Sequence, residues 1–243
     1  MQQSSALTTS LFSTPNQQEK QQNNSKLLRF HIVLQASTAI SQKSEGAPIT
    51  YLNRGQSYSI HLNDRFCEDN IIHSQFIIAF HDPSHQKIAV NYWRFWISQQ
   101  KDSQHARAVD VDMSQSTGIL NVKYPSFDRI DFYWHGRNGA KLSLKFHCLS
   151  TDFSRIKGVK GIPLRAYVSS QMTTSMDPLL MCQYSGSFIP SRKTDNSSPT
   201  YLDYNEHCYC KVKLFRDKGA ERKNKDDAKQ IKRQFEKMMT GKR

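Results

Sequence analysis

The sequence contains no apolar run close to the roughly 18 residues that a membrane-spanning helix needs. Its N-terminus also lacks the basic start and the following apolar stretch that are typical of a secretory signal peptide. We therefore expect a protein that is neither embedded in a membrane nor secreted. Its five cysteines are an odd number in a chain of 243 residues, which does not fit a disulfide framework and favours a reducing compartment.

Sequence motifs that carry catalysis are missing as well. There is no Gly-x-Ser-x-Gly, no His-Glu-x-x-His and no glycine-rich phosphate loop between a strand and a helix, so we expect no enzymatic activity. Residues 147–148 and 207–210 contain His and Cys, the preferred ligands of zinc, but they lack the Cys-x-x-Cys spacing. Cys148, Cys208 and Cys210 share a strand face with apolar residues, which predicts buried thiols and no metal or other cofactor.

What the chain has in excess is positive charge. It contains 34 Lys and Arg against 21 Asp and Glu, a net charge of +13, which favours a polyanionic partner such as nucleic acid or an anionic membrane surface. Residues 216–243 carry eleven Lys or Arg and five acidic residues. Within them, residues 220–239 lack Pro and Gly, which predicts a short basic helix with a thin apolar stripe at Ile231, Phe235 and positions 238–239.

Composition divides the chain into three parts. Residues 1–26 are rich in Gln, Ser, Thr and Asn and poor in apolar side chains, which predicts a disordered leader. We assign one domain to residues 27–226 and a basic, helical tail to 227–243. Within the domain, residues 173–206 contain scattered Pro, Gly and polar residues and are predicted to form a long loop.

Short runs in which apolar and polar residues alternate recur through the domain, with the period of two that is typical of strands. No long helical pattern separates them, which predicts an all-β fold, a β-sandwich with long loops. Trp93, Trp96 and Trp134 lie within apolar runs and are expected in the core. The residues predicted to face inward are Phe30, Ile32, Leu34; Tyr58, Ile60, Leu62; Ser74, Phe76, Ile78, Phe80; Val109, Val111, Met113; Ile130, Phe132, Trp134; Leu142, Leu144, Phe146, Cys148; and Cys208, Cys210, Val212, Leu214.

Four continuous segments of the sequence are distinctive. The longest is Ile-Thr-Tyr-Leu-Asn-Arg-Gly-Gln-Ser-Tyr at residues 49–58. The others are Phe-His-Cys-Leu-Ser-Thr-Asp-Phe at 146–153, Lys-Gly-Val-Lys-Gly-Ile-Pro at 157–163 and Lys-Gly-Ala-Glu-Arg-Lys at 218–223. Together they resemble the DNA-binding domain of the Grainyhead/LSF transcription factors, and the resemblance covers residues from about 28 to 225. In such a factor, the leader at residues 1–26 is either a passive tail or a contact for transcription co-regulators.

This resemblance implies an immunoglobulin-like β-sandwich, a nuclear location and sequence-specific binding to double-stranded DNA as a homodimer, at sites with a C-N-R-G core. It also implies that Arg222 approaches a guanine in the major groove and that Lys157 and Gly158 meet the DNA. Lys225 occupies a basic position nearby. With Lys223, we expect Lys157, Gly158 and Lys225 to hold the phosphates while Arg222 reads a base.

The chain departs from the family in three places. The segment at residues 85–106 is shorter than in the family and differs from it in sequence, and the predicted loop at 173–206 is longer. The chain stops at Arg243 without the family's oligomerisation region, so we expect either a fragment or a protein that pairs through its DNA-binding domain alone. Two alternatives to sequence-specific reading remain. One is a β-sandwich that binds RNA or acidic lipid headgroups without sequence preference, and the other is a scaffold that has lost DNA binding.

Overall fold

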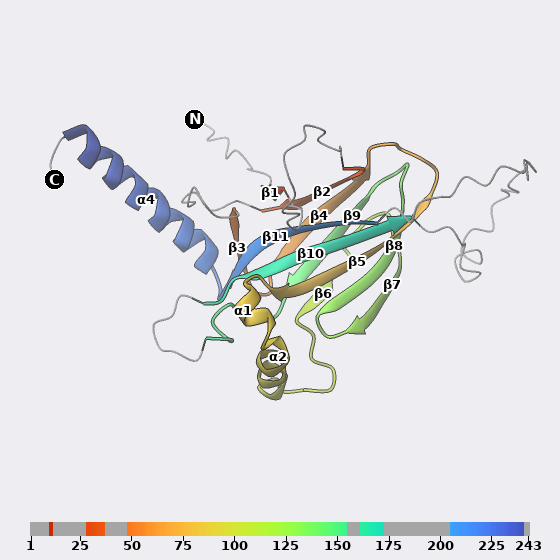
Figure 1. Cartoon of the computed structure of the whole chain (residues 1–243), viewed down its shortest axis with the longest axis horizontal. Coiled ribbons are helices and arrows are strands. Elements are labelled where there is room, and N and C mark those ends of the chain that lie inside the picture. Colours follow the sequence, from red (N-terminus) through yellow and green to blue (C-terminus); the bar gives the residue numbers. More distant parts are fainter. Residues whose placement is uncertain (1–9, 12–27, 37–47, 155–160, 173–204, 241–243) are drawn as a thin grey trace, which may run out of the picture.

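The computed structural model of the chain describes residues 10–11, 28–36, 48–154, 161–172 and 205–240, which form two β-sheets around one hydrophobic core (Figure 1). All strand pairs are antiparallel except β3 and β11, which run parallel. The first sheet has, in spatial order, the strands β1 (Ser10–Leu11), β2 (Phe30–Gln35), β4 (Ser57–Asp64), β9 (Ala140–Phe146) and β6 (Val109–Val111). The second has β3 (Ile49–Asn53), β11 (Asn205–Phe215), β10 (Leu164–Met172), β5 (Ile71–Phe80), β8 (Arg129–His135) and β7 (Ile119–Ser126).

Most of the core comes from the inner faces that the alternating pattern predicts, so the all-β sandwich is confirmed. Six of the seven predicted inner faces are buried along their whole length, and Cys148, Cys208 and Cys210 are buried among them. The exception is the face of Val109, Val111 and Met113, where Val109 is buried and Val111 is half-buried. Met113 is 58% exposed because β6 ends at Val111 and the chain then turns. Trp134 is fully buried and donates from Nε1 to Oγ of Ser74 at 2.9 Å, which satisfies its polar atom inside the core.

Two short helices that the sequence reasoning did not predict cover one end of the second sheet. They are α1 (Pro83–Gln86) and α2 (Ala89–Ser98). Trp93 and Trp96 are three residues apart and therefore lie on one face of α2, where both are buried as expected. Trp93 packs edge-on against Phe153, with ring centroids 4.8 Å apart. With ten residues, α2 has about three helical turns, and its apolar positions are too few to distinguish a helix from a short apolar run in the sequence.

The C-terminal helix α4 (Gly219–Thr240) confirms the helix predicted at 220–239, and it runs without a break through the domain boundary placed at 226–227. It is 22 residues long and points away from the sandwich (Figure 1). Only its first part packs on β3 and β11, and residues 229–239 are all exposed. The predicted apolar stripe is present, but Ile231, Phe235 and positions 238–239 are exposed to solvent. Within the described residues, no helix is long and apolar enough to span a lipid bilayer.

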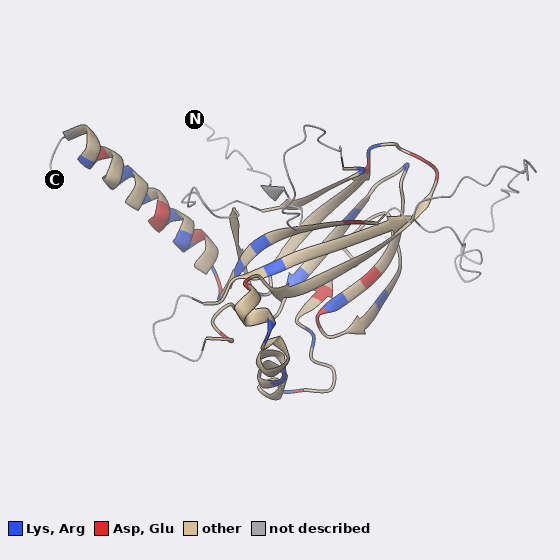
Figure 2. Cartoon of the chain, viewed as in Figure 1, with Lys and Arg blue, Asp and Glu red and all other residues tan. Residues whose placement is uncertain are grey.

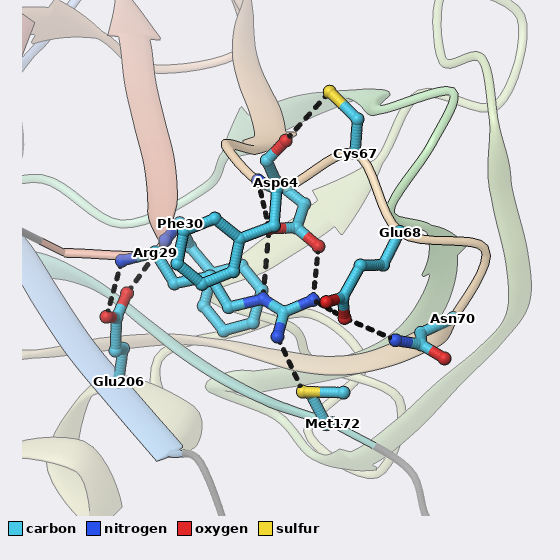
Figure 3. A network of polar contacts seen from close by, with 9 residues as sticks. Arg29, Phe30, Asp64, Cys67, Glu68, Asn70, Met172 and Glu206 are labelled. Carbon is cyan, nitrogen blue, oxygen red and sulfur yellow. Dashed lines mark hydrogen bonds and ion pairs between the residues drawn. The ribbon is translucent and has the colours of Figure 1, made fainter.

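At the end of the sandwich opposite α4, a buried arginine ties four segments together (Figure 3). Arg29 pairs with Asp64 through Nε at 2.9 Å and Nη2 at 2.6 Å, and Nη2 also reaches Oε2 of Glu68 at 2.7 Å. Glu206, near the start of β11, accepts hydrogen bonds from the backbone N–H groups of Arg29 and Phe30 at 2.7 and 2.9 Å. This network fixes the start of β2 to β4 and β11, at the end of the sandwich away from α4.

Candidate nucleic-acid interface

The first turn of α4 is held against the turn between β3 and β4 by one buried side chain, that of Asn53. Its Oδ1 accepts a hydrogen bond from the backbone N–H of Ala220 at 2.9 Å, and its Nδ2 donates to Oε2 of Glu221 at 2.8 Å. A Cβ atom on Gly219 would lie 2.8 Å from Cβ of Phe215, so only glycine fits where β11 passes into the helix. The direction in which α4 leaves the sandwich is therefore set by its contacts with the sheet.

A second anchor lies two turns further along α4. Asp227 is buried against β3, where Tyr51 donates from its hydroxyl to Oδ2 at 3.2 Å and Lys223 forms a short ion pair with Oδ1. Burial, and then the negative charge of Asp227, raise the pKa of Tyr51 to about 12. The phenol therefore remains a protonated donor at neutral pH, and the charge of Lys223 is balanced within the protein.

We expect Asn53→Ala to lower the free energy of unfolding by about 1–2 kcal/mol, because it removes the cap of α4 and leaves a helix N–H without its acceptor. Urea unfolding followed by circular dichroism measures this difference. Gln56→Ala is the matched control, because Gln56 is exposed and its Oε1 accepts a hydrogen bond from Nδ2 of Asn53 at 3.0 Å without contacting the helix N–H. Equal stability of the two variants would show that Asn53 does not hold the helix.

Two of the residues predicted to contact DNA are exposed on α4. Arg222 lies in the first turn and Lys225 one turn later, and neither forms an ion pair with any residue that the structure describes. Ala220 and Asp227 are buried on the other side of the helix. Because residues three, four and seven apart share a helix face, docking that face on β3 leaves Arg222 and Lys225 directed to solvent. Lys223 differs from both, because it points toward the sheet and pairs with Asp227.

The other two predicted contacts, Lys157 and Gly158, lie outside the described residues. The residues that flank them are described, and their hydrogen bonds lead to the end of β11 that precedes α4. Ile162 donates from its backbone N–H to the carbonyl of Ser150 at 2.8 Å, and Ser150 exchanges hydrogen bonds of 3.0 Å with Leu214. The structure therefore brings the flanks of this lysine segment to the same end of the sandwich as Arg222.

The sequence reasoning did not single out Arg54, which lies at the same end. Arg54 is exposed in the turn between β3 and β4, and its backbone N–H donates to the carbonyl of Phe215 at 2.8 Å. The following N–H, of Gly55, donates to the carbonyl of Phe146 at 2.8 Å. The signal was present, since Arg54 is part of the longest phrase that carries the family resemblance, but only the parallel pairing of β3 with β11 places it beside α4.

Lys and Arg residues occur along the length of α4 and also on β10 and β11 (Figure 2). The end of the sandwich thus combines a capped, projecting helix, exposed cations on separate segments and a sheet that supports them. A surface of this kind suits a polyanion, because the cations can replace condensed counterions along a phosphate backbone. Within the described residues, no group of three or more His, Cys, Asp or Glu side chains is placed to hold a metal ion.

The sequence of the chain is similar to those of known proteins. Residues 1–184 and 189–237 match the family described as CP2 transcription factor. The chain is 32% identical over 213 residues to human Grainyhead-like protein 1 homolog, which covers 84% of this chain and 30% of that protein. It is 31% identical over 206 residues to protein grainyhead of Drosophila melanogaster, which covers 82% of this chain and 13% of that protein. The chain therefore matches less than a third of the length of these relatives.

Proposed function

Since this chain belongs to the CP2 family of transcription factors, we propose that it binds double-stranded DNA with sequence specificity at the end of the sandwich from which α4 leaves. The observation that carries the proposal is the position of Arg222. It is exposed on the first turn of a helix that is capped by Asn53 and anchored through Asp227. A guanidinium on such a support can donate two hydrogen bonds to O6 and N7 of a guanine.

The proposed division of work assigns base reading to Arg222 and phosphate contacts to Lys157, Gly158, Lys223 and Lys225. Contacts of both kinds are needed, because phosphate contacts fix the register of a protein on the duplex and base contacts select the sequence. The finer proposals are a C-N-R-G core in the target site, pairing of two copies on DNA, a nuclear location and regulation of transcription by RNA polymerase II. These finer proposals rest on the membership of the family.

Selection of binding sites from a pool of random duplexes tests this proposal directly. We expect enrichment of duplexes with a C-N-R-G core, followed by a higher affinity for the selected duplex than for a scrambled one at the same salt concentration. Equal affinity for selected, scrambled and RNA duplexes would favour a general polyanion-binding module. No binding to any duplex at low salt would favour a scaffold without DNA-binding activity.

The ion pair between Lys223 and Asp227 changes what we expect from the lysines of α4. Lys225→Gln should reduce the slope of log Kobs against log salt by about 1, because one phosphate contact is lost on every sequence. Lys223→Gln should reduce the slope by less, since its charge is already balanced by Asp227. Fluorescence anisotropy at several salt concentrations measures both slopes. A larger change for Lys223→Gln would mean that this side chain leaves Asp227 when DNA binds.

A further inference from the structure

A second cationic cluster lies on the outer face of the second sheet. Arg165 on β10 and Lys211 on β11 are direct cross-strand partners, and both alternate with buried residues and therefore point outward. Like charges that face each other across a strand pair destabilise a sheet. Among the described residues, no carboxylate forms an ion pair with either side chain. The fold alone gives no reason for placing them together.

The contacts around Arg165 hold its charge in place instead of relieving the repulsion. Its guanidinium carbon lies 4.3 Å from the ring centroid of Tyr209, and its Nε donates to Nδ1 of His81 at 3.2 Å. His81 accepts this hydrogen bond as a neutral imidazole. Burial first, then the charges of Lys211 and Arg165, lower the pKa of His81 to about 4, and only Asp82 acts in the opposite direction. The cluster is therefore a preorganised positive patch in which, among the described residues, no carboxylate pairs with Arg165 or Lys211.

This patch adjoins the proposed DNA surface along the chain and in space. The backbone N–H of His81 donates to the carbonyl of Pro163 at 3.1 Å, and Pro163 follows the segment that contains Lys157 and Gly158. Lys211 lies four residues before the end of β11, which leads into α4. At about 3.3 Å per strand residue, Lys211 is on the order of 13 Å from that end, which is close to the roughly 12 Å width of the major groove of a duplex.

We propose that Arg165 and Lys211, with His81 beside them, bind phosphates of the DNA backbone that flank the sequence read by Arg222. This inference rests on the proposed function and extends it, because it predicts a duplex footprint that continues over the outer face of β10 and β11. Guanidinium and ammonium groups are the usual protein ligands of phosphate. Occupation by a phosphate also offsets the repulsion between the two cations, which explains why a sheet tolerates them as direct neighbours.

The test is the Arg165→Gln/Lys211→Gln double variant of the full chain, assayed by anisotropy on a selected duplex with long flanks. We expect the salt slope to fall by about 2 and the affinity near physiological salt to fall on the order of 10-fold. The matched control is Lys101→Gln/Lys123→Gln, which removes the same charge from exposed positions on other elements and should leave the slope close to that of the wild type. Thermal unfolding of the Arg165→Gln/Lys211→Gln variant should occur at the same or a higher temperature.

A second readout follows the His81 ring by NMR titration. Phosphates bound at the patch should raise the pKa of His81 when the long duplex is added, which a purely structural patch would not show. The inference is overturned if the two double variants have equal salt slopes while the wild type still prefers one duplex sequence. The proposed function would then remain intact. Absence of any preferred duplex overturns the proposed function itself. If inorganic phosphate raises the pKa of His81 and the duplex does not, the patch binds a free anion and the inference is wrong.

Discussion

Replacing Arg222 with glutamine is expected to lower the affinity for the preferred duplex by about 5- to 150-fold, which corresponds to the ~1–3 kcal/mol of one bidentate guanine contact. The loss should be small on a scrambled duplex, where the side chain has no guanine to grip. Replacement of the guanine in the target should weaken wild-type binding to a similar extent and should have little effect on the variant. This pattern separates base reading from a general loss of charge.

The physical reason for so large an effect is the support under the side chain. Ala220 and Asp227 fix the helix face opposite Arg222, and the Asn53 cap sets the position of the first turn. The guanidinium is therefore presented with little backbone entropy left to lose on binding. Arg222 also forms no ion pair with any described residue that would have to be broken first.

Arg233→Gln is the matched control for Arg222→Gln, because Arg233 is an exposed arginine of the same helix and its replacement removes the same charge. Competition binding with selected and scrambled duplexes at fixed salt measures both variants. Equal losses on the two duplexes for Arg222→Gln would refute the base-reading role and assign Arg222 to the phosphates. Arg222→Lys distinguishes further, because lysine keeps the charge but not the planar pair of donors.

At the other end of the sandwich, Arg29→Met is expected to lower the free energy of unfolding by about 3–5 kcal/mol, because it leaves the fully buried carboxylate of Asp64 without its counter-charge. Arg29 is also almost fully buried, with 6% of its side chain exposed. In the wild type, the two carboxylate oxygens of Asp64 accept hydrogen bonds from Nε and Nη2 of Arg29. This arrangement offsets much of the cost of removing two charges from water.

Denaturant unfolding of Arg29→Met should show the loss in full, with Arg137→Met as the control. Arg137 and Asp69 form an exposed ion pair at 3.9 Å, and pairs of this kind contribute about 0–1 kcal/mol. Adding Asp64→Asn to Arg29→Met should restore part of the stability, since the buried group is then neutral and still accepts the backbone N–H of Phe66. If Arg29→Met lowered the free energy of unfolding no more than Arg137→Met, the buried network would contribute no more to stability than an exposed ion pair.

The strand pattern shows how far the sequence alone specified the fold. Inner faces with large apolar residues at every second position, such as Phe76, Ile78 and Phe80, were predictable because the alternation is direct. Strand β10 was not predicted, although it pairs with both β5 and β11. Its buried face includes Ala166 and Ser170, which are too small or too polar to mark a strand in a single sequence.

The candidate site divides in the same way. Arg222 and Lys225 were predicted from a basic phrase and are exposed on α4. The pairing of Lys223 with Asp227 was not predictable, because it depends on how α4 docks on Tyr51. The cluster of Arg165 and Lys211 was hidden for a related reason: 45 positions separate the two residues in the sequence, and only the register of β10 and β11 makes them neighbours.

By itself, the sequence determined the two-sheet architecture, the buried cysteines, the basic helix and the membership of the CP2 family. These properties follow from local alternation, local composition and continuous phrases, each of which is contained in a short stretch of chain. The tertiary structure alone decided which basic residues share a surface and which are neutralised. That decision depends on strand register and helix docking, which join residues far apart in the chain through contacts that no local pattern encodes.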